Sequence, residues 1–106
     1  MVASELIDSA LTCLKTAVPL GTRLVLFGSR ARGDARDNSD LDILVIEPQV
    51  ADSVTEMIRL SRLTGQHLIP ADIVVMNDAT FQKQRQITNT LAWRAAREGI
   101  FHDCIH

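Results

Sequence analysis

Three short runs of aliphatic residues set the strongest limit on how this chain can fold. They are TRLVLFG at residues 22–28, LDILVIE at residues 41–47 and ADIVVM at residues 71–76. Each run is too short for a useful buried helix, and its branched side chains favour a strand. The chain has 106 residues, 46% of them hydrophobic, which suffices for one core. We therefore expect a single domain, residues 1–106, around a sheet of three or more strands.

Helical periodicity fills the segments around these strands. Apolar side chains recur every three or four positions in residues 3–17 and again in residues 51–65, where Val54 and Ile58 belong to the apolar stripe. From Asp78 to Glu98 the same pattern predicts one long helix. The expected fold class is therefore α/β (α+β), with helices flanking a small sheet.

The spacing of the strands predicts a mixed sheet. About 24 residues with helical character separate the second and third strands, which suits a parallel crossover. Only about 12 charged residues separate the first and second strands, so we expect these two to be antiparallel. The end of the first strand should then meet the starts of the other two at one edge of the sheet.

Three acidic residues are expected at that edge. Asp40 and Asp42 begin the second strand and Asp72 begins the third. Residues two apart in a strand project from the same face, so Asp40 and Asp42 should lie side by side. Converging carboxylates repel each other unless cations lie between them, and an all-oxygen ligand set favours magnesium. We predict a magnesium site at these three residues, with two ions expected.

A phosphate site is expected beside the acids. Gly28 lets the backbone approach a ligand closely, and Ser29 can begin a turn whose free N–H groups bind phosphate. Arg30, Arg32 and Arg36 can add positive charge to the same anion. Carboxylates that hold metal beside a turn that holds triphosphate are what nucleotidyl transfer requires. The alternative is a solvated loop in which the arginines pair with neighbouring aspartates.

The sequence does not match other known ligand-binding motifs. GSRARG begins like a phosphate-binding P-loop, but Asp34 and Ala35 stand where Lys and Ser or Thr are required. A calcium loop that begins at Asp34 or Asp37 lacks the central glycine and the final glutamate. A dinucleotide fingerprint is absent as well.

The segment GSRARG followed by NSDLDILV, with a later Asp72 on another strand, resembles the DNA polymerase beta-like nucleotidyltransferase superfamily. Its fuller form resembles the minimal nucleotidyltransferases, the MNT proteins, which are encoded beside HEPN-domain partners as toxin-antitoxin pairs. REGIF at residues 97–101 looks like the usual ending of that family. The resemblance implies a nucleotidyltransferase fold.

The resemblance also implies roles for individual residues. Asp40 and Asp42 would bind magnesium, and Asp72 would complete the metal site and help to deprotonate the acceptor. The triphosphate would be held by Gly28, Ser29 and Arg32. The implied reaction transfers AMP, or another nucleotide, from NTP to a hydroxyl and releases pyrophosphate.

For this family the implied acceptor is a tyrosine hydroxyl of a HEPN toxin, whose RNase activity is blocked by the AMPylation. Larger members add helical domains over the site, so a partner or a second copy of the chain should complete it here. Two alternatives stay open: an antitoxin that neutralises its toxin by binding alone, and a stand-alone enzyme that modifies a small hydroxylated molecule. The nucleotide is not identified by any recognisable base contact.

Composition limits the remaining function classes. A net charge of -2 provides no positive field for strong nucleic-acid binding. The first residues lack the pattern of a signal peptide, and no stretch approaches the ~18 apolar residues of a membrane span. We expect a cytoplasmic protein. His102, Cys104 and His106 could be drawn as metal ligands, but a frayed tail is the expected structure there.

Overall fold

A four-stranded sheet in the order β3-β2-β1-β4 organises the protein. The computed structural model describes residues 3–28 and 40–104. The elements in chain order are α1 (Ala3–Lys15), β1 (Arg23–Phe27), β2 (Leu41–Glu47), α3 (Ser53–Gln66), β3 (Ala71–Asn77), α4 (Asp78–Gln84), α5 (Leu91–Glu98) and β4 (Ile100–Asp103). The expected α+β class, with a mixed sheet flanked by helices, is confirmed.

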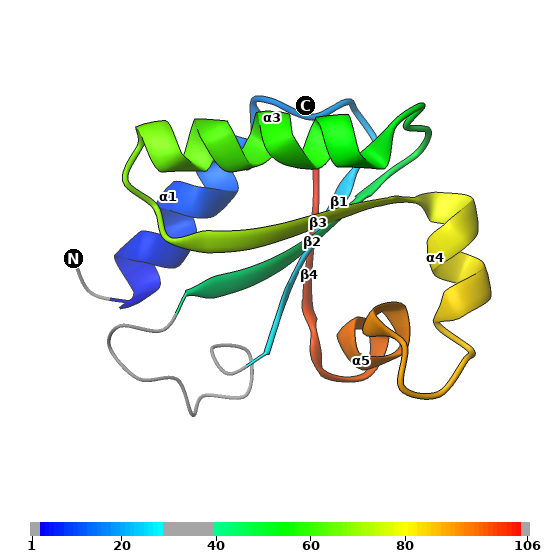
Figure 1. The fold of residues 1–106 in the computed structure, drawn as a ribbon. Coiled ribbons are helices and arrows are strands. Elements are labelled where there is room, and N and C mark those ends of the chain that lie inside the picture. Colours follow the sequence, from blue (N-terminus) through cyan, green and yellow to red (C-terminus); the bar gives the residue numbers. More distant parts are fainter. Residues whose placement is uncertain (1–2, 29–39, 105–106) are drawn as a thin grey trace.

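Strand directions agree with the spacing argument. β1 is antiparallel to β2, and β2 is parallel to β3. Helix α3 supplies the crossover between the two parallel strands and packs chiefly on β3 (Figure 1). The end of β1 therefore meets the starts of β2 and β3, as the sequence predicts.

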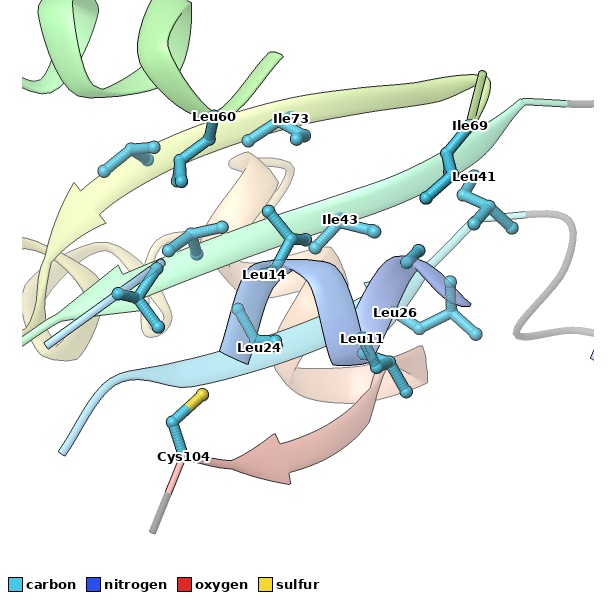
Figure 2. Close-up of a cluster of buried hydrophobic side chains, with 14 residues drawn as sticks. Leu11, Leu14, Leu24, Leu26, Leu41, Ile43, Leu60, Ile69, Ile73 and Cys104 are labelled. Carbon is cyan, nitrogen blue, oxygen red and sulfur yellow. The ribbon is translucent and has the colours of Figure 1, made fainter. Parts of the chain in front are cut away.

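Helices cover both faces of the sheet (Figure 1). On one face, α1 and α3 pack on a large apolar cluster, and Figure 2 shows Leu11 and Leu14 of α1 over Leu24 of β1 and Ile43 of β2. A second cluster on the other face joins Val25, Leu44 and Ile46 to α4 and α5. Because β2 is covered on both sides, nearly all its residues are apolar, as in buried parallel strands.

The prediction of one helix from Asp78 to Glu98 is wrong, because the chain turns between α4 and α5. Asn89 takes a left-handed backbone conformation with φ of 71°. The Thr90 hydroxyl donates to the Gln84 carbonyl over 2.7 Å and accepts from the Trp93 N–H over 3.1 Å. These side-chain bonds compete with helix continuation and cap a new helix instead. None of the helices within the described ranges has the length and apolarity needed to cross a membrane.

The prediction of a frayed tail is also wrong for residues 100–104. β4 pairs antiparallel with β1, with His102 opposite Leu24. Cys104 is 1% exposed and packs in the cluster beneath α1 (Figure 2). Its N–H donates to the Thr22 carbonyl over 2.8 Å. His106 lies outside the described residues. The segment is held by strand pairing with β1, which local sequence does not reveal.

Helix α3 is rotated relative to the apolar stripe expected from its sequence. Leu60 and Thr64 face the core, whereas Val54 and Ile58 are 57% and 47% exposed. The apolar stripe expected from the sequence is therefore wider than the face that packs on the sheet. Helix α3 carries apolar surface that no described residue covers.

A buried carboxyl at the far end of β2 contacts α3, which in turn contacts the segment that follows α1. Glu47, 3% exposed, shares a hydrogen bond with Glu56 of α3. Glu56 also binds Arg59, with an Arg59 Nε to Glu56 Oε1 distance of 2.7 Å, and Arg59 donates to the Ala17 carbonyl over 2.7 Å. Burial, followed by the contact with Glu56, raises the pKa of Glu47 to about 8. The bond to Arg59 lowers the pKa of Glu56 to about 2. Glu47 is therefore protonated at neutral pH and donates to the Glu56 carboxylate.

We predict that Glu47 makes the protein less stable as the pH rises. Its pKa in the folded state lies above the ordinary glutamate value of 4.5, so its contribution is fully present below about pH 4.5 and is lost as the pH rises to about 8. Glu47→Gln keeps a donor for Glu56 without a titrating proton. The variant should gain more than about 1 kcal/mol over wild type between pH 5 and pH 8, measured by urea unfolding at each pH.

Asp8→Asn is the matched control, because it removes one negative charge from an exposed position on α1. Its pH dependence should follow that of wild type. If the free energy of unfolding of Glu47→Gln and of wild type depended on pH in the same way, Glu47 would be ionised in the folded protein at neutral pH. That result would contradict the prediction.

Candidate functional site

The register of β2 and β3 sets two carboxylates side by side. Asp42 and Asp72 are direct Cα partners in the parallel pair, and Phe27 is the partner of Asp42 in β1. Directly paired residues project from the same face of a sheet. Phe27 belongs to the cluster on the α4 and α5 face, so both carboxylates lie on that face. Two of the three predicted acids thus come from strands 30 residues apart and lie in one row.

Buried neighbours fix which way these acids point. Leu41, Ile43 and Ile73 all pack in the cluster beneath α1 and α3. Strand alternation then directs Asp42 and Asp72 to the opposite face. The Leu41 N–H also donates to the Pro70 carbonyl over 2.9 Å, which fixes the starts of β2 and β3 relative to each other. The apolar pattern of the strands is therefore what aims the carboxylates.

Asp40 occupies a different position from the other two acids. It is exposed and lies just before β2, outside the strand pairing. Within residues 3–28 and 40–104, no three or more His, Cys, Asp or Glu side chains are arranged to hold a metal ion. The row of paired acids therefore contains two carboxylates, with Asp40 two residues away along the chain.

Gly28 lies against Asp42 at the end of β1. Its φ is 77°, a conformation that side chains rarely adopt, and a Cβ atom there would overlap Asp42 Oδ2. Both the positive φ and the close approach of Asp42 therefore favour glycine at position 28. Ser29, Arg30, Arg32 and Arg36 lie outside the described residues, so their predicted roles stay predictions.

The chemistry of this row fits a hard cation. Magnesium in nucleotide-dependent proteins is usually held by one or two carboxylates together with phosphate oxygens of the substrate. Asp42 and Asp72 provide two such carboxylates on one face, beside a glycine whose missing side chain leaves room for the Asp42 carboxylate. A third protein ligand is not a requirement of such a site.

A groove of about 570 Å³ continues from Asp72 along β3. Its walls include Ile58 and Arg62 of α3 and the consecutive residues Ala71–Val74 of β3. The sequence did not predict this groove, because periodicity places Ile58 on the same apolar stripe as the residues that pack on the sheet. The one available signal is an arginine, Arg62, one helical turn after Ile58.

A second hollow, of about 530 Å³, lies between α1 and α3 and is lined by Asp8, Cys13 and His67. These residue types could suggest a cysteine nucleophile with its base. Burial raises the pKa of the Cys13 thiol, however, and an activated thiol requires a lowered one. Asp42 and Asp72 project from the opposite face of the sheet, so this hollow is separate from the carboxylate row.

We predict that Gly28→Ala displaces Asp42 and destabilises the fold by more than about 1 kcal/mol, since both the positive φ and the overlap with Oδ2 oppose a side chain. Gly65→Ala is the control: a Cβ there meets nothing within 4 Å, so alanine should stabilise helix α3 by about 0.5–1 kcal/mol. Thermal unfolding of both variants measures the difference. Equal stability of Gly28→Ala and wild type would contradict the close approach.

Comparison with known proteins supports the nucleotidyltransferase fold expected from the sequence. Residues 7–93 match the family model of the nucleotidyltransferase domain. A crystal structure of a candidate nucleotidyltransferase from Sulfolobus solfataricus is similar at 26% identity and a TM-score of 0.56, over 74% of this chain and 70% of that one. A toxin-antitoxin structure with AMP-PNP is similar at 21% identity and a TM-score of 0.60, over 94% of this chain and 72% of that one. No curated protein sequence matches.

The second of these likenesses shows the fold alone, because its sequence identity is low. The family model covers most of the chain, including Gly28 and all three predicted acids. The nucleotidyltransferase fold implied by GSRARG and NSDLDILV is thereby confirmed. This chain belongs to the nucleotidyltransferase domain family.

Proposed function

We propose that the protein transfers a nucleoside monophosphate, AMP in the simplest case, from NTP to a hydroxyl group of a partner protein. The observation that carries this proposal is the pairing of Asp42 with Asp72 beside Gly28, on one face of a nucleotidyltransferase fold. Carboxylates in adjacent strand positions repel each other, and a cation bound between them removes that repulsion.

Magnesium is the expected cofactor, held by Asp42 and Asp72 with Asp40 as a further ligand. When bound, magnesium neutralises the negative charge of the triphosphate during transfer. Gly28 and Ser29 bind the phosphates through the backbone, and Arg32 adds positive charge to them.

The transfer balances without any further reactant. The acceptor oxygen forms a bond to the α-phosphorus, the bond between that phosphorus and the bridging oxygen of the β-phosphate breaks, and pyrophosphate leaves. Asp72 accepts the proton of the acceptor hydroxyl, a role for which its exposed position at the start of β3 is suited. Asp42, half-buried against Gly28, keeps a fixed position beside the reacting phosphate.

The proposed partner is a HEPN-domain toxin, and the proposed result is an antitoxin that blocks its partner by AMPylation. Support comes from the resemblance of residues 27–46 to the MNT proteins and from the shared fold with a toxin-antitoxin structure that contains AMP-PNP. The chain contains no tyrosine, so a tyrosine acceptor must lie outside these 106 residues.

A second candidate function is neutralisation by binding alone. It is supported by the shared fold with a toxin-antitoxin structure, a likeness that does not depend on a metal site. Under this alternative, toxin inhibition would need no nucleotide. It would also survive replacement of Asp42 and Asp72.

We predict that Asp42→Asn and Asp72→Asn each lower magnesium-dependent transfer of label from ATP to the partner by about 10²–10⁴-fold, because each removes a carboxylate that is used in the reaction. Transfer is measured with α-labelled ATP, purified protein and a purified HEPN-domain protein as the acceptor. Asp8→Asn changes an exposed acid on α1, which covers the other face of the sheet, and should retain full transfer.

Undiminished labelling in both Asp42→Asn and Asp72→Asn would reject catalysis at this row. Inhibition of the toxin that persists in both variants, without label, would instead establish the binding-only antitoxin. Circular dichroism of each variant separates loss of activity from loss of fold.

A further inference from the structure

The outer edge of β3 has no strand partner among the described residues, although β3 is seven residues long and rich in apolar side chains. Such an edge presents unpaired backbone N–H and carbonyl groups, and proteins commonly protect it with inward-facing charges, proline or a bulge. From Ile73 to Met76 the strand carries none of these residues. Its edge is therefore open to pairing with another extended segment.

The groove beside β3 follows this open edge. Its lining includes four consecutive residues, Ala71–Val74, and successive strand side chains point to opposite faces. A groove confined to one face would touch alternate residues only, so this groove reaches the edge itself. Figure 1 shows α3 lying along β3, and α3 provides the second wall.

The second wall carries an apolar anchor and an unpaired positive charge. Ile58 is about half exposed and offers apolar surface at the groove. Arg62, which lines the same groove, makes no hydrogen bond or ion pair with any described residue. A guanidinium in this position is suited to a carboxylate of a ligand.

Asp72 belongs both to this groove and to the paired carboxylate row. We infer that the groove binds an extended, acidic segment of the acceptor protein as an added strand on β3, which brings the acceptor hydroxyl to Asp72. This inference rests on the proposed transfer and names the shape and charge of its substrate. Backbone pairing would supply affinity, while Ile58 and Arg62 would select the sequence.

A second copy of the chain fits the same edge less well. In a symmetric antiparallel pair of β3 strands centred on Val74, Asp72 would lie opposite Met76. Neither Asp72 nor Arg62 would then gain an opposite charge. An acidic acceptor segment provides a partner for Arg62, and a hydroxyl provides one for Asp72.

The test uses the intact protein and two synthetic peptides of about nine residues, enough to span β3. Both have a central tyrosine in an extended, threonine-rich sequence. One has glutamate directly before and after the tyrosine, where the side chains face α3 when the tyrosine faces Asp72, and the other has lysine there. Amide hydrogen exchange of residues 71–77 is followed without nucleotide. The glutamate peptide should slow exchange at alternate β3 amides, since only every second N–H faces outward.

Substitutions in the groove should change peptide affinity in a defined way. The glutamate peptide should bind about threefold more tightly than the lysine peptide. Arg62→Glu should reverse that order. Ile58→Ser should weaken both peptides by about fivefold. Ile87→Ser, a matched change at a residue that is 56% exposed outside the groove, should leave both affinities unchanged.

The outcomes separate this inference from the proposed function, because binding is measured without transfer. Slowed β3 exchange that is sensitive to Arg62 supports the inference even if no AMP is transferred. No peptide-induced change in β3 exchange, or affinities unaffected by Arg62→Glu and Ile58→Ser, would overturn it. Slowed exchange that grows with protein concentration, together with a sedimenting dimer, would also overturn it and assign the edge to a second copy.

Discussion

The parallel pairing of β2 with β3 is the contact on which both the fold and the carboxylate row depend. The two strands are direct neighbours in the sheet, and one side of each is buried beneath α1 and α3. A slip of one residue would turn Ile73 outward and carry Asp72 into the core, at the cost of an unpaired buried charge. Burial of the apolar residues next to Asp42 and Asp72 in the sequence therefore holds these two acids side by side.

Those parts of the structure with a strong local signal could be predicted from the sequence. The second strand is a continuous apolar run between Asp40 and Pro48, and β2 has the expected bounds, residues 41–47. The row containing Asp42 and Asp72 followed from strand directions, which loop length and the intervening helix determined. The roles of Asp40 as a metal ligand and of Ser29 and Arg32 as phosphate ligands stay predictions.

The features that could not be predicted depend on contacts between distant residues or on competition within a turn. β4 gains its backbone bonds from β1, nearly 80 residues earlier, and its own four residues carry no alternating pattern. The break before α5 depends on whether Thr90 bonds to a nearby carbonyl or continues a helix, and both are compatible with the letters. The rotation of α3 depends on which residues meet the sheet, so Ile58 could not be assigned to either side from periodicity alone.

The two borders of the sheet are unequal, and this limits how the protein can assemble with strand-forming partners. One border is the seven-residue β3, whereas the other is the four-residue β4, which ends beside the buried Cys104. A head-to-tail array needs two complementary borders, repeated from molecule to molecule. The long border and the short border of this sheet do not match each other, which disfavours a repeating array. Each copy of the protein offers one β3 border, so we expect it to bind one extended segment there.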